Sequence, residues 1–306
     1  MSHTFSETWR VSLHGGHTGE FCAHASGTLK ERLQQAIDAG YHTFGVSEHV
    51  SRPQPYLYRE EIARGWDAEK LEERFAAYTT ALPPLTDEFA SELIILRGFE
   101  AEVVPISGYK EKMLSQRDSR LPSGKPAFDY FVGSVHYVNG IEIDGSLELF
   151  HDLIEESCGL EKFIVRYFQT VTEMVEALKP DVVGHIDLPR KNLLKAGLGS
   201  DMPESRETLA AERETLEAIR AAGAILDLNL AALRKGLPTP YPAPGLVKRA
   251  HAMGVPFCFG DDSHRSGEVG EGLEKGRQYL LDLGVNQIGI ITKENGEVVR
   301  KSVSLL

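Results

Sequence analysis

Residues 206–230 read RETLAAERETLEAIRAAGAILDLNL and combine one predicted helix with one predicted strand. Apolar side chains recur at helical spacing through 206–222, and Gly223 ends that pattern. Residues 224–230 then form an apolar run of strand length. A helix followed directly by a buried strand is typical of a parallel sheet whose faces are covered by helices.

The same alternation continues along the whole chain. Helical patterns are predicted over 28–39, 68–81, 160–178, 206–222 and 245–253, and strands over 11–14, 43–47, 93–100, 130–136, 182–186, 224–230 and 255–260. The Asn295-Gly296 turn predicts a short hairpin over 287–303. The chain has 306 residues, of which 42% are hydrophobic, so it can bury a large core. Because α/β barrels reach this length as one unit, we expect residues 1–306 to form a single domain.

Histidines and carboxylates gather where the predicted strands end. Seven of the eleven histidines do so, in the strings Leu13-His14-Gly15-Gly16-His17, Cys22-Ala23-His24, Ser47-Glu48-His49, Gly133-Ser134-Val135-His136, Gly184-His185-Ile186-Asp187 and Gly260-Asp261-Asp262-Ser263-His264. Glu100 follows another strand in the same way. Neutral imidazole and carboxylate are ligands for zinc, iron or manganese, so the pattern predicts a metal site.

A closed barrel brings nearly every strand end to one rim. The positions of these candidate ligands therefore favour a closed barrel over an open doubly wound sheet.

Charge and composition exclude several classes of partner. The net charge of −12 disfavours nucleic acid, whose binding depends on basic side chains that neutralise phosphates. Stretches of the eighteen or so apolar residues that span a bilayer are absent, and residues 1–10 lack the apolar core of a leader peptide. Three widely spaced cysteines fit a reducing compartment. We therefore expect a cytoplasmic protein that acts on a small molecule.

Several ordered strings resemble the polymerase-and-histidinol-phosphatase (PHP) superfamily, and most closely its histidinol-phosphatase branch. The resemblance covers nearly the whole chain and rests on Phe21-Cys22-Ala23-His24-Ala25-Ser26-Gly27, Gly133-Ser134-Val135-His136-Tyr137, Gly184-His185-Ile186-Asp187-Leu188-Pro189-Arg190-Lys191, Asp227-Leu228-Asn229 through Leu233-Arg234, Tyr241-Pro242-Ala243-Pro244 and Gly260-Asp261-Asp262-Ser263-His264-Arg265. It implies a distorted (β/α)7 barrel of the TIM-like, PHP type.

The resemblance also implies two or three divalent metal ions (Zn, Mn or Fe) and their ligands. By this likeness, His14, His17, Glu100 and Asp262 hold a first metal, Glu100 bridges to a second held by His136 and His185, and His24, His49 and His264 hold a third. The predicted catalytic residues are Glu100, Asp262 and His264. One departure stands out: the family's first strand normally ends His-x-His, whereas this chain has two glycines between His14 and His17. A bulge can absorb the extra residue.

Other side chains near these motifs are candidates for supporting roles. Arg234 is the best candidate for binding phosphate, with Arg190, Lys191 and Arg265 behind it, because basic side chains pair with phosphate oxygens. Asp187 and Asp261 are expected to orient ligand imidazoles, and so is Glu48. Cys22 is expected to fill space as a small apolar residue.

These features together favour a metal-dependent phosphatase. By family likeness the substrate is L-histidinol phosphate, and its hydrolysis is a step in histidine biosynthesis. The expected nucleophile is a hydroxide that bridges two metals. A second possibility is a related phosphoesterase that acts on another small phosphate monoester, such as a nucleotide or sugar phosphate. A third is a catalytically inactive metal-binding scaffold, suggested by the altered first motif alone. A nucleic-acid exonuclease is disfavoured by the acidic charge.

Overall fold

The computed structural model describes residues 8–306. Residues 1–7, which are most of the segment considered above as a leader peptide, lie outside the described residues. Seven parallel strands close into a barrel in the order β1 (Val11–Ser12), β2 (Thr43–His49), β3 (Ile94–Ala101), β4 (Val132–Gly133), β7 (Val182–Val183), β8 (Ile225–Asn229) and β9 (Phe257–Gly260). Pairing of β9 with β1 closes the ring through Ser12 and Phe259. The predicted barrel is confirmed.

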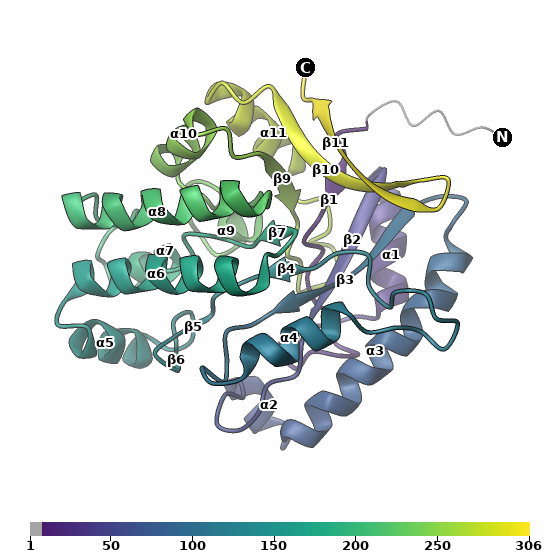
Figure 1. Cartoon of the computed structure of the whole chain (residues 1–306), viewed down its shortest axis with the longest axis horizontal. Helices are drawn as coiled ribbons and strands as arrows, with labels where there is room; N and C mark the ends of the chain where they lie inside the picture. The colour runs from purple at the N-terminus through teal and green to yellow at the C-terminus, as the bar shows by residue number, and fades with distance from the viewer. Residues whose placement is uncertain (1–7) are drawn as a thin grey trace.

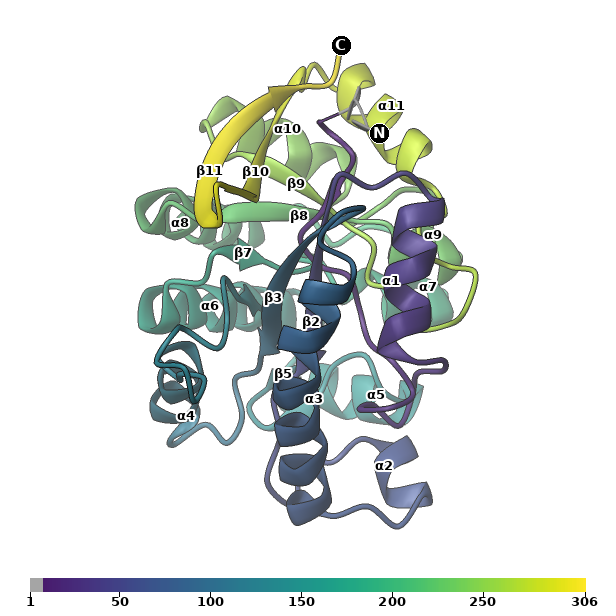
Figure 2. The same cartoon turned by 90° about the vertical axis from the view of Figure 1, so that its right-hand side faces the viewer.

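Helices surround this ring (Figure 1). They are α1 (Leu29–Asp38), α2 (Arg59–Ala63), α3 (Ala68–Glu88), α4 (Tyr109–Arg117), α5 (Leu147–Glu156), α6 (Leu160–Leu178), α7 (Arg190–Lys195), α8 (Arg206–Ala222), α9 (Ala231–Arg234), α10 (Pro244–Ala252) and α11 (Leu273–Asp282). Local sequence sets their ends: Ser205 accepts a hydrogen bond from the Thr208 amide at the start of α8, and Gly223 ends it with a φ of 69°. Figure 2 shows α3 lying across β2 and β3.

Glycine makes room for an aromatic side chain inside the barrel. Gly45 on β2 and Gly98 on β3 leave the space that the Tyr130 ring fills, and a β-carbon at either position would overlap that ring. Tyr130 is buried, and its hydroxyl donates a hydrogen bond to the Val46 carbonyl over 3.3 Å. Because protein cores are densely packed, these two positions tolerate no larger residue without displacement of the ring.

An antiparallel hairpin, β10 (Gln287–Glu294) and β11 (Glu297–Ser304), covers the end of the barrel at which the strands begin (Figure 1). The Thr292 hydroxyl lies 2.8 Å from that of Thr43 at the start of β2. Lys293 donates hydrogen bonds to the Ile95 carbonyl on β3 over 2.9 Å and to Asp129 over 2.7 Å. The hairpin was predicted and leaves only the opposite end, where the strands terminate, for a site.

The strands are shorter than predicted where they carry candidate ligands. β1 ends at Ser12, β4 at Gly133 and β7 at Val183, so the residues up to His14, His136 and His185 lie in loops. A second hairpin, β5 (Tyr137–Val138) and β6 (Ile141–Glu142), follows β4 and was not predicted. Helix α3 continues through Pro83 and Pro84 to Glu88, beyond the predicted end at residue 81. No helix in residues 8–306 is long and apolar enough to cross a membrane.

The barrel interior predicts a large cost for one added methyl group. We expect Gly98→Ala to lower the free energy of unfolding by about 1 to 3 kcal/mol, because the new β-carbon displaces Tyr130. Chemical denaturation measures this, with the exposed Lys30→Ala as the control, which should change stability by less than about 0.5 kcal/mol. Equal stability of the two variants would contradict the packing described.

Candidate metal centre

Barrel topology brings the candidate ligands to one place. His49 and Glu100 end neighbouring strands and are paired partners in the β2–β3 ladder. His14, His136, His185 and Asp262 follow β1, β4, β7 and β9 by two or three residues. Because the strands are parallel, all of these side chains reach the same rim. The structure therefore gathers residues that are up to about 250 positions apart in the sequence.

The Glu100 carboxylate lies at the centre of five imidazoles. It is 1% exposed, and its two oxygens lie 3.4 Å from His14 Nε2, 3.1 Å from His17 Nε2, 3.1 Å from His49 Nδ1, 3.7 Å from His136 Nε2 and 3.3 Å from His185 Nε2. Burial raises the pKa of Glu100, but His14, His49 and His136 outweigh this and hold the pKa well below its usual range. A buried carboxylate requires compensating positive charge, and these groups surround it with metal-ligand atoms.

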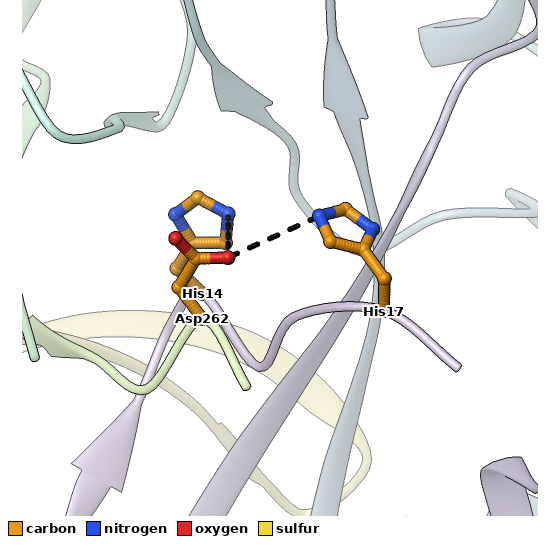
Figure 3. A group of neighbouring side chains, drawn as sticks. All are labelled: His14, His17 and Asp262. Carbon is orange, nitrogen blue, oxygen red and sulfur yellow. Dashed lines mark ion pairs between the residues drawn. The ribbon is translucent and has the colours of Figure 1, made fainter. Parts of the chain in front are cut away.

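The double glycine keeps both histidines of the first motif in the centre. His14 and His17 both lie beside Asp262, with Nε2 atoms 3.9 and 4.0 Å from its Oδ1 (Figure 3). Gly16 has a φ of 93° and bridges to Ser263, and a β-carbon there would overlap the Ser263 backbone. Glycine is required at this turn. The departure from His-x-His therefore does not remove His17 from Glu100.

A second group of imidazoles forms the outer part of the centre. The ring centroid of His24 lies 5.4 Å from that of His49 and 5.1 Å from that of His264. Tyr58, from the loop after β2, packs 5.2 Å from the His24 ring and is buried. Cys22 is buried with its sulfur 3.2 Å from His24 Nδ1, and it also shares a compact group with His17 and Glu48. The thiol thus lies within the centre, although it was expected only to fill space.

Three carboxylates hold the ligand imidazoles. Asp227 lies 2.8 Å from His14 Nδ1, Glu102 lies 2.6 Å from His136 Nδ1, and Glu48 lies 3.5 Å from His17 Nδ1. Such partners fix the ring orientation, so that the other ring nitrogen faces the metal. A supporting role was predicted for Glu48, which lies beside His17 without a hydrogen bond to it, and was missed for Asp227 and Glu102. Glu102 had a sequence signal, because its spacing of two from Glu100 places both side chains on one face of a strand.

Asp187 and Asp261 do not orient imidazoles, and that prediction was wrong. Asp187 accepts hydrogen bonds from the Ala243 amide over 2.7 Å and from Arg190 over 3.3 Å. Asp261 accepts from the Tyr41 hydroxyl over 2.7 Å and from the Gly270 amide over 2.9 Å. Both side chains therefore anchor the loops that carry His185 and Asp262. His185 and Asp262 adopt left-handed backbone conformations, with φ of 22° and 46°, and such strain often accompanies functional positions.

The predicted phosphate-binding residues differ in position. Arg234 donates to the backbone carbonyls of Asp261 and, over 3.0 Å, Asp262, while its Nη1 is buried without a hydrogen bond. Lys191 is bound to Asp144 and Arg265 is exposed beside His264. The Arg190 guanidinium is fully buried and donates to Ser200, Thr239, Pro240 and Asp187. Because its donors are taken up by these groups, Arg190 is unsuited to phosphate and has a structural role.

Comparison with known proteins agrees with this geometry. A family model described as "PHP domain" matches residues 13–231. The chain belongs to the PHP domain family. A Schizosaccharomyces pombe relative named "Probable histidinol-phosphatase" is 31% identical, with 95% of this chain and 93% of that protein covered, and the Saccharomyces cerevisiae histidinol-phosphatase is 28% identical, with 88% of each covered. The fold of this PHP domain matches the Lactococcus lactis histidinol phosphate phosphatase, solved with zinc, L-histidinol and phosphate, at 18% identity and a TM-score of 0.69, covering 95% and 99% of the two chains.

The side chains of the PHP domain fit bound metal ions. His14 Nε2, His49 Nδ1 and Glu100 Oε2 are buried at the centre and make no hydrogen bond within the described residues. Buried polar atoms without partners are costly unless a ligand satisfies them. Compact donor groups are formed by His14, His17 and Asp262, by His14, Glu100 and His185, and by His17, His49 and Glu100. His17 thus joins two of these groups, whereas the family likeness assigned it to the first metal alone.

Loss of an orienting carboxylate should weaken metal binding. We expect Asp227→Asn to reduce zinc affinity by about 10- to 100-fold, because His14 loses the partner that fixes its ring. Competition with a chromophoric chelator measures the affinity. Asp87→Asn on helix α3, outside the centre, serves as the matched control and should bind zinc like the unchanged protein. Identical affinities of the two variants would show that Asp227 does not support the centre.

Metal binding should release protons. Burial lowers the pKa of His136, but Glu102 and Glu100 outweigh it and raise the pKa to about 9, so this imidazole is protonated at pH 7 without metal. Ligation requires neutral imidazole, so protons compete more strongly as the pH falls below about 9. Calorimetry at pH 7 in buffers of different ionisation enthalpy should report the release of about one proton or more per protein. A heat that does not depend on the buffer would contradict this.

Proposed function

We propose that this protein is a metal-dependent phosphatase that hydrolyses L-histidinol phosphate to L-histidinol and phosphate. The observation that carries the proposal is the buried Glu100 carboxylate within 3.1 to 3.7 Å of five imidazole nitrogens, at the open rim of the barrel. The histidinol-phosphatase names of relatives aligned over nearly the whole chain support the choice of substrate.

The residues around Glu100 have separable roles in this reaction. We infer that His14, His17, His49, His136, His185 and Asp262 hold the metal ions with Glu100, and that His24 and His264 complete the outer site. Bound divalent ions supply the activation of water and neutralise negative charge on the phosphoryl group. Arg234, which donates to the Asp262 carbonyl, is assigned to phosphoryl oxygens because a guanidinium forms paired hydrogen bonds with them, and its Nη1 lies 4.0 Å from Asp261 Oδ1. Asp262 and Glu100 fix the positions of the metal ions, and the phosphate binds beside these ions.

The electrostatic environment of the rim suits a substrate that carries a negatively charged phosphate and a positively charged ammonium group. Glu142 ends the β5–β6 hairpin that follows His136, and Asp144 lies two residues further along the chain. Asp144 is bound to Lys191, whereas burial and Asp144 raise the pKa of Glu142 to about 7. Glu142 makes no ion pair within residues 8–306 and lies on the hairpin that follows His136, so its ionised form can attract the ammonium group of an amino alcohol phosphate. A catalytically inactive scaffold rested on the altered first motif, which still brings both imidazoles to Glu100 and so gives that alternative no support.

The proposal is tested by phosphate release from a panel of monoesters. With zinc or manganese, we expect kcat/KM for L-histidinol phosphate to exceed that for a nucleoside monophosphate or a sugar phosphate by about 100-fold, since pocket contacts set this ratio. Chelation should abolish the activity, and added metal should restore it. A preference for another ester would identify a different substrate. Inactivity toward every ester with each metal tested would refute the phosphatase function.

Glu100→Gln provides the matched test of the centre. The change keeps the size of the side chain but removes the charge that balances the metals, so we expect kcat/KM to fall by about 1,000-fold or more. Glu88→Gln, at the exposed end of α3, should retain full activity. Circular dichroism of both variants checks that they are folded. Undiminished activity of Glu100→Gln would place the chemistry elsewhere.

A further inference from the structure

Lys235 is a basic side chain at the rim that the sequence motifs did not single out. It follows α9 directly, at the carboxyl end of the barrel, and is partly buried. Its ammonium lies 5.9 Å from the centroid of the Tyr241 ring, which in turn packs 6.4 Å from the His185 ring. Asp262 in the centre and the neighbouring Asp144, Lys191 and Arg234 are the charged groups that influence the pKa of Lys235. Lys235 therefore lies beside the metal centre.

The other basic side chains nearby have hydrogen-bond acceptors within the protein. Arg234 is held by the carbonyls of Asp261 and Asp262, and Lys191 is held by Asp144. Within residues 8–306, by contrast, Lys235 Nζ has no acceptor at hydrogen-bond distance and no carboxylate within ion-pair distance. A partly buried ammonium in such a position loses hydration without full compensation. The leaving oxygen of a phosphate ester at the centre would supply the missing acceptor.

We propose that Lys235 is the general acid that protonates the leaving alkoxide oxygen of the phosphate monoester. This inference rests on the proposed phosphatase function and names a residue for the one step that the metal ligands leave unassigned. Arg234 is the better partner for phosphoryl oxygens, because its guanidinium pairs with them and retains its proton. Lys235 is the basic group at this rim that combines free donors with the ability to release one.

The electrostatics of the site agree with proton donation. Burial lowers the pKa of Lys235, partly opposed by Asp262, and the nearby Lys191 and Arg234 act in the same direction as burial. A lowered pKa makes an ammonium a stronger acid, as general acid catalysis near neutral pH requires. In the step itself, a water oxygen forms a bond to phosphorus as the ester P–O bond breaks, and the proton that the water loses passes to solvent. The Nζ proton passes to the leaving oxygen, which departs as the alcohol, and the neutral amine regains a proton from solvent.

The dependence of rate on the leaving group tests this role. A 4-nitrophenolate leaves as a stable anion, whereas an alkoxide requires a proton. We therefore expect Lys235→Met to lower kcat for L-histidinol phosphate by about 100-fold and kcat for 4-nitrophenyl phosphate by less than about 5-fold. Lys235→Arg keeps the charge but is a poor acid, so it should not restore alkyl ester hydrolysis. Lys248→Met, on the exposed face of α10, is the control and should match the unchanged protein on both esters.

A binding measurement separates proton donation from phosphate binding. Calorimetry of the metal-loaded protein with inorganic phosphate measures the dissociation constants of Lys235→Met and of the unchanged protein. We expect the two constants to agree within about 3-fold, because loss of a charge-assisted hydrogen bond to phosphate would weaken binding by more than this. Equal rate losses on the two esters, rescue by Lys235→Arg, or much weaker phosphate binding would overturn the acid role.

Failure of the underlying function gives a different result. If the unchanged protein hydrolyses another alkyl phosphate but not L-histidinol phosphate, only the substrate is wrong, and the same variants are compared on that ester. If the unchanged protein hydrolyses neither alkyl nor aryl esters, the phosphatase and the general acid are both refuted.

Discussion

The structure depends on the cost of burying the Glu100 carboxylate. A charged group that is 1% exposed in a barrel of apolar side chains is tolerated only where positive charge or metal surrounds it. Five imidazoles meet this requirement, and they come from the ends of several different strands of the barrel. The same contacts that make the carboxylate tolerable therefore fix the relative positions of the loops, and they create a site for more than one cation.

The rest of the fold can be understood as support for that arrangement. Gly45 and Gly98 accommodate Tyr130 inside the barrel, and the β10–β11 hairpin closes the opposite end by contacts with Thr43 and Ile95. At the rim, Asp227 and Glu102 hold imidazoles, whereas Asp187 and Asp261 hold the loops from which ligands project. Rigid support from the barrel and from the rim matters because a metal centre requires its ligands to be positioned within fractions of an ångström.

The sequence predicted the barrel, and it predicted that the candidate ligands meet at one rim, because both depend on local patterns. Strand and helix periods are local, and parallel strands necessarily bring their ends to one rim. Interactions between distant segments were less accessible. Nothing local distinguishes Asp227, which binds His14, from Asp187, which binds Arg190, because each carboxylate lies within or shortly after a buried strand. The burial of Arg190 and the position of the Lys235 ammonium likewise depend on loops that meet only after folding. The β5–β6 hairpin was missed because its strands have two residues each, too short for a periodic signal.

The central claim is that distant imidazoles and carboxylates hold a cluster of metal ions around Glu100. Anomalous diffraction from crystals of the metal-loaded protein, recorded at the zinc, manganese and iron edges, tests it most directly. The account predicts two or three peaks within ligand distance of the Glu100 centre, at about 2.0 to 2.2 Å from imidazole nitrogen or carboxylate oxygen. Crystals of protein shown by elemental analysis to contain metal, but with no peak beside Glu100 or with peaks elsewhere on the molecule, would contradict it.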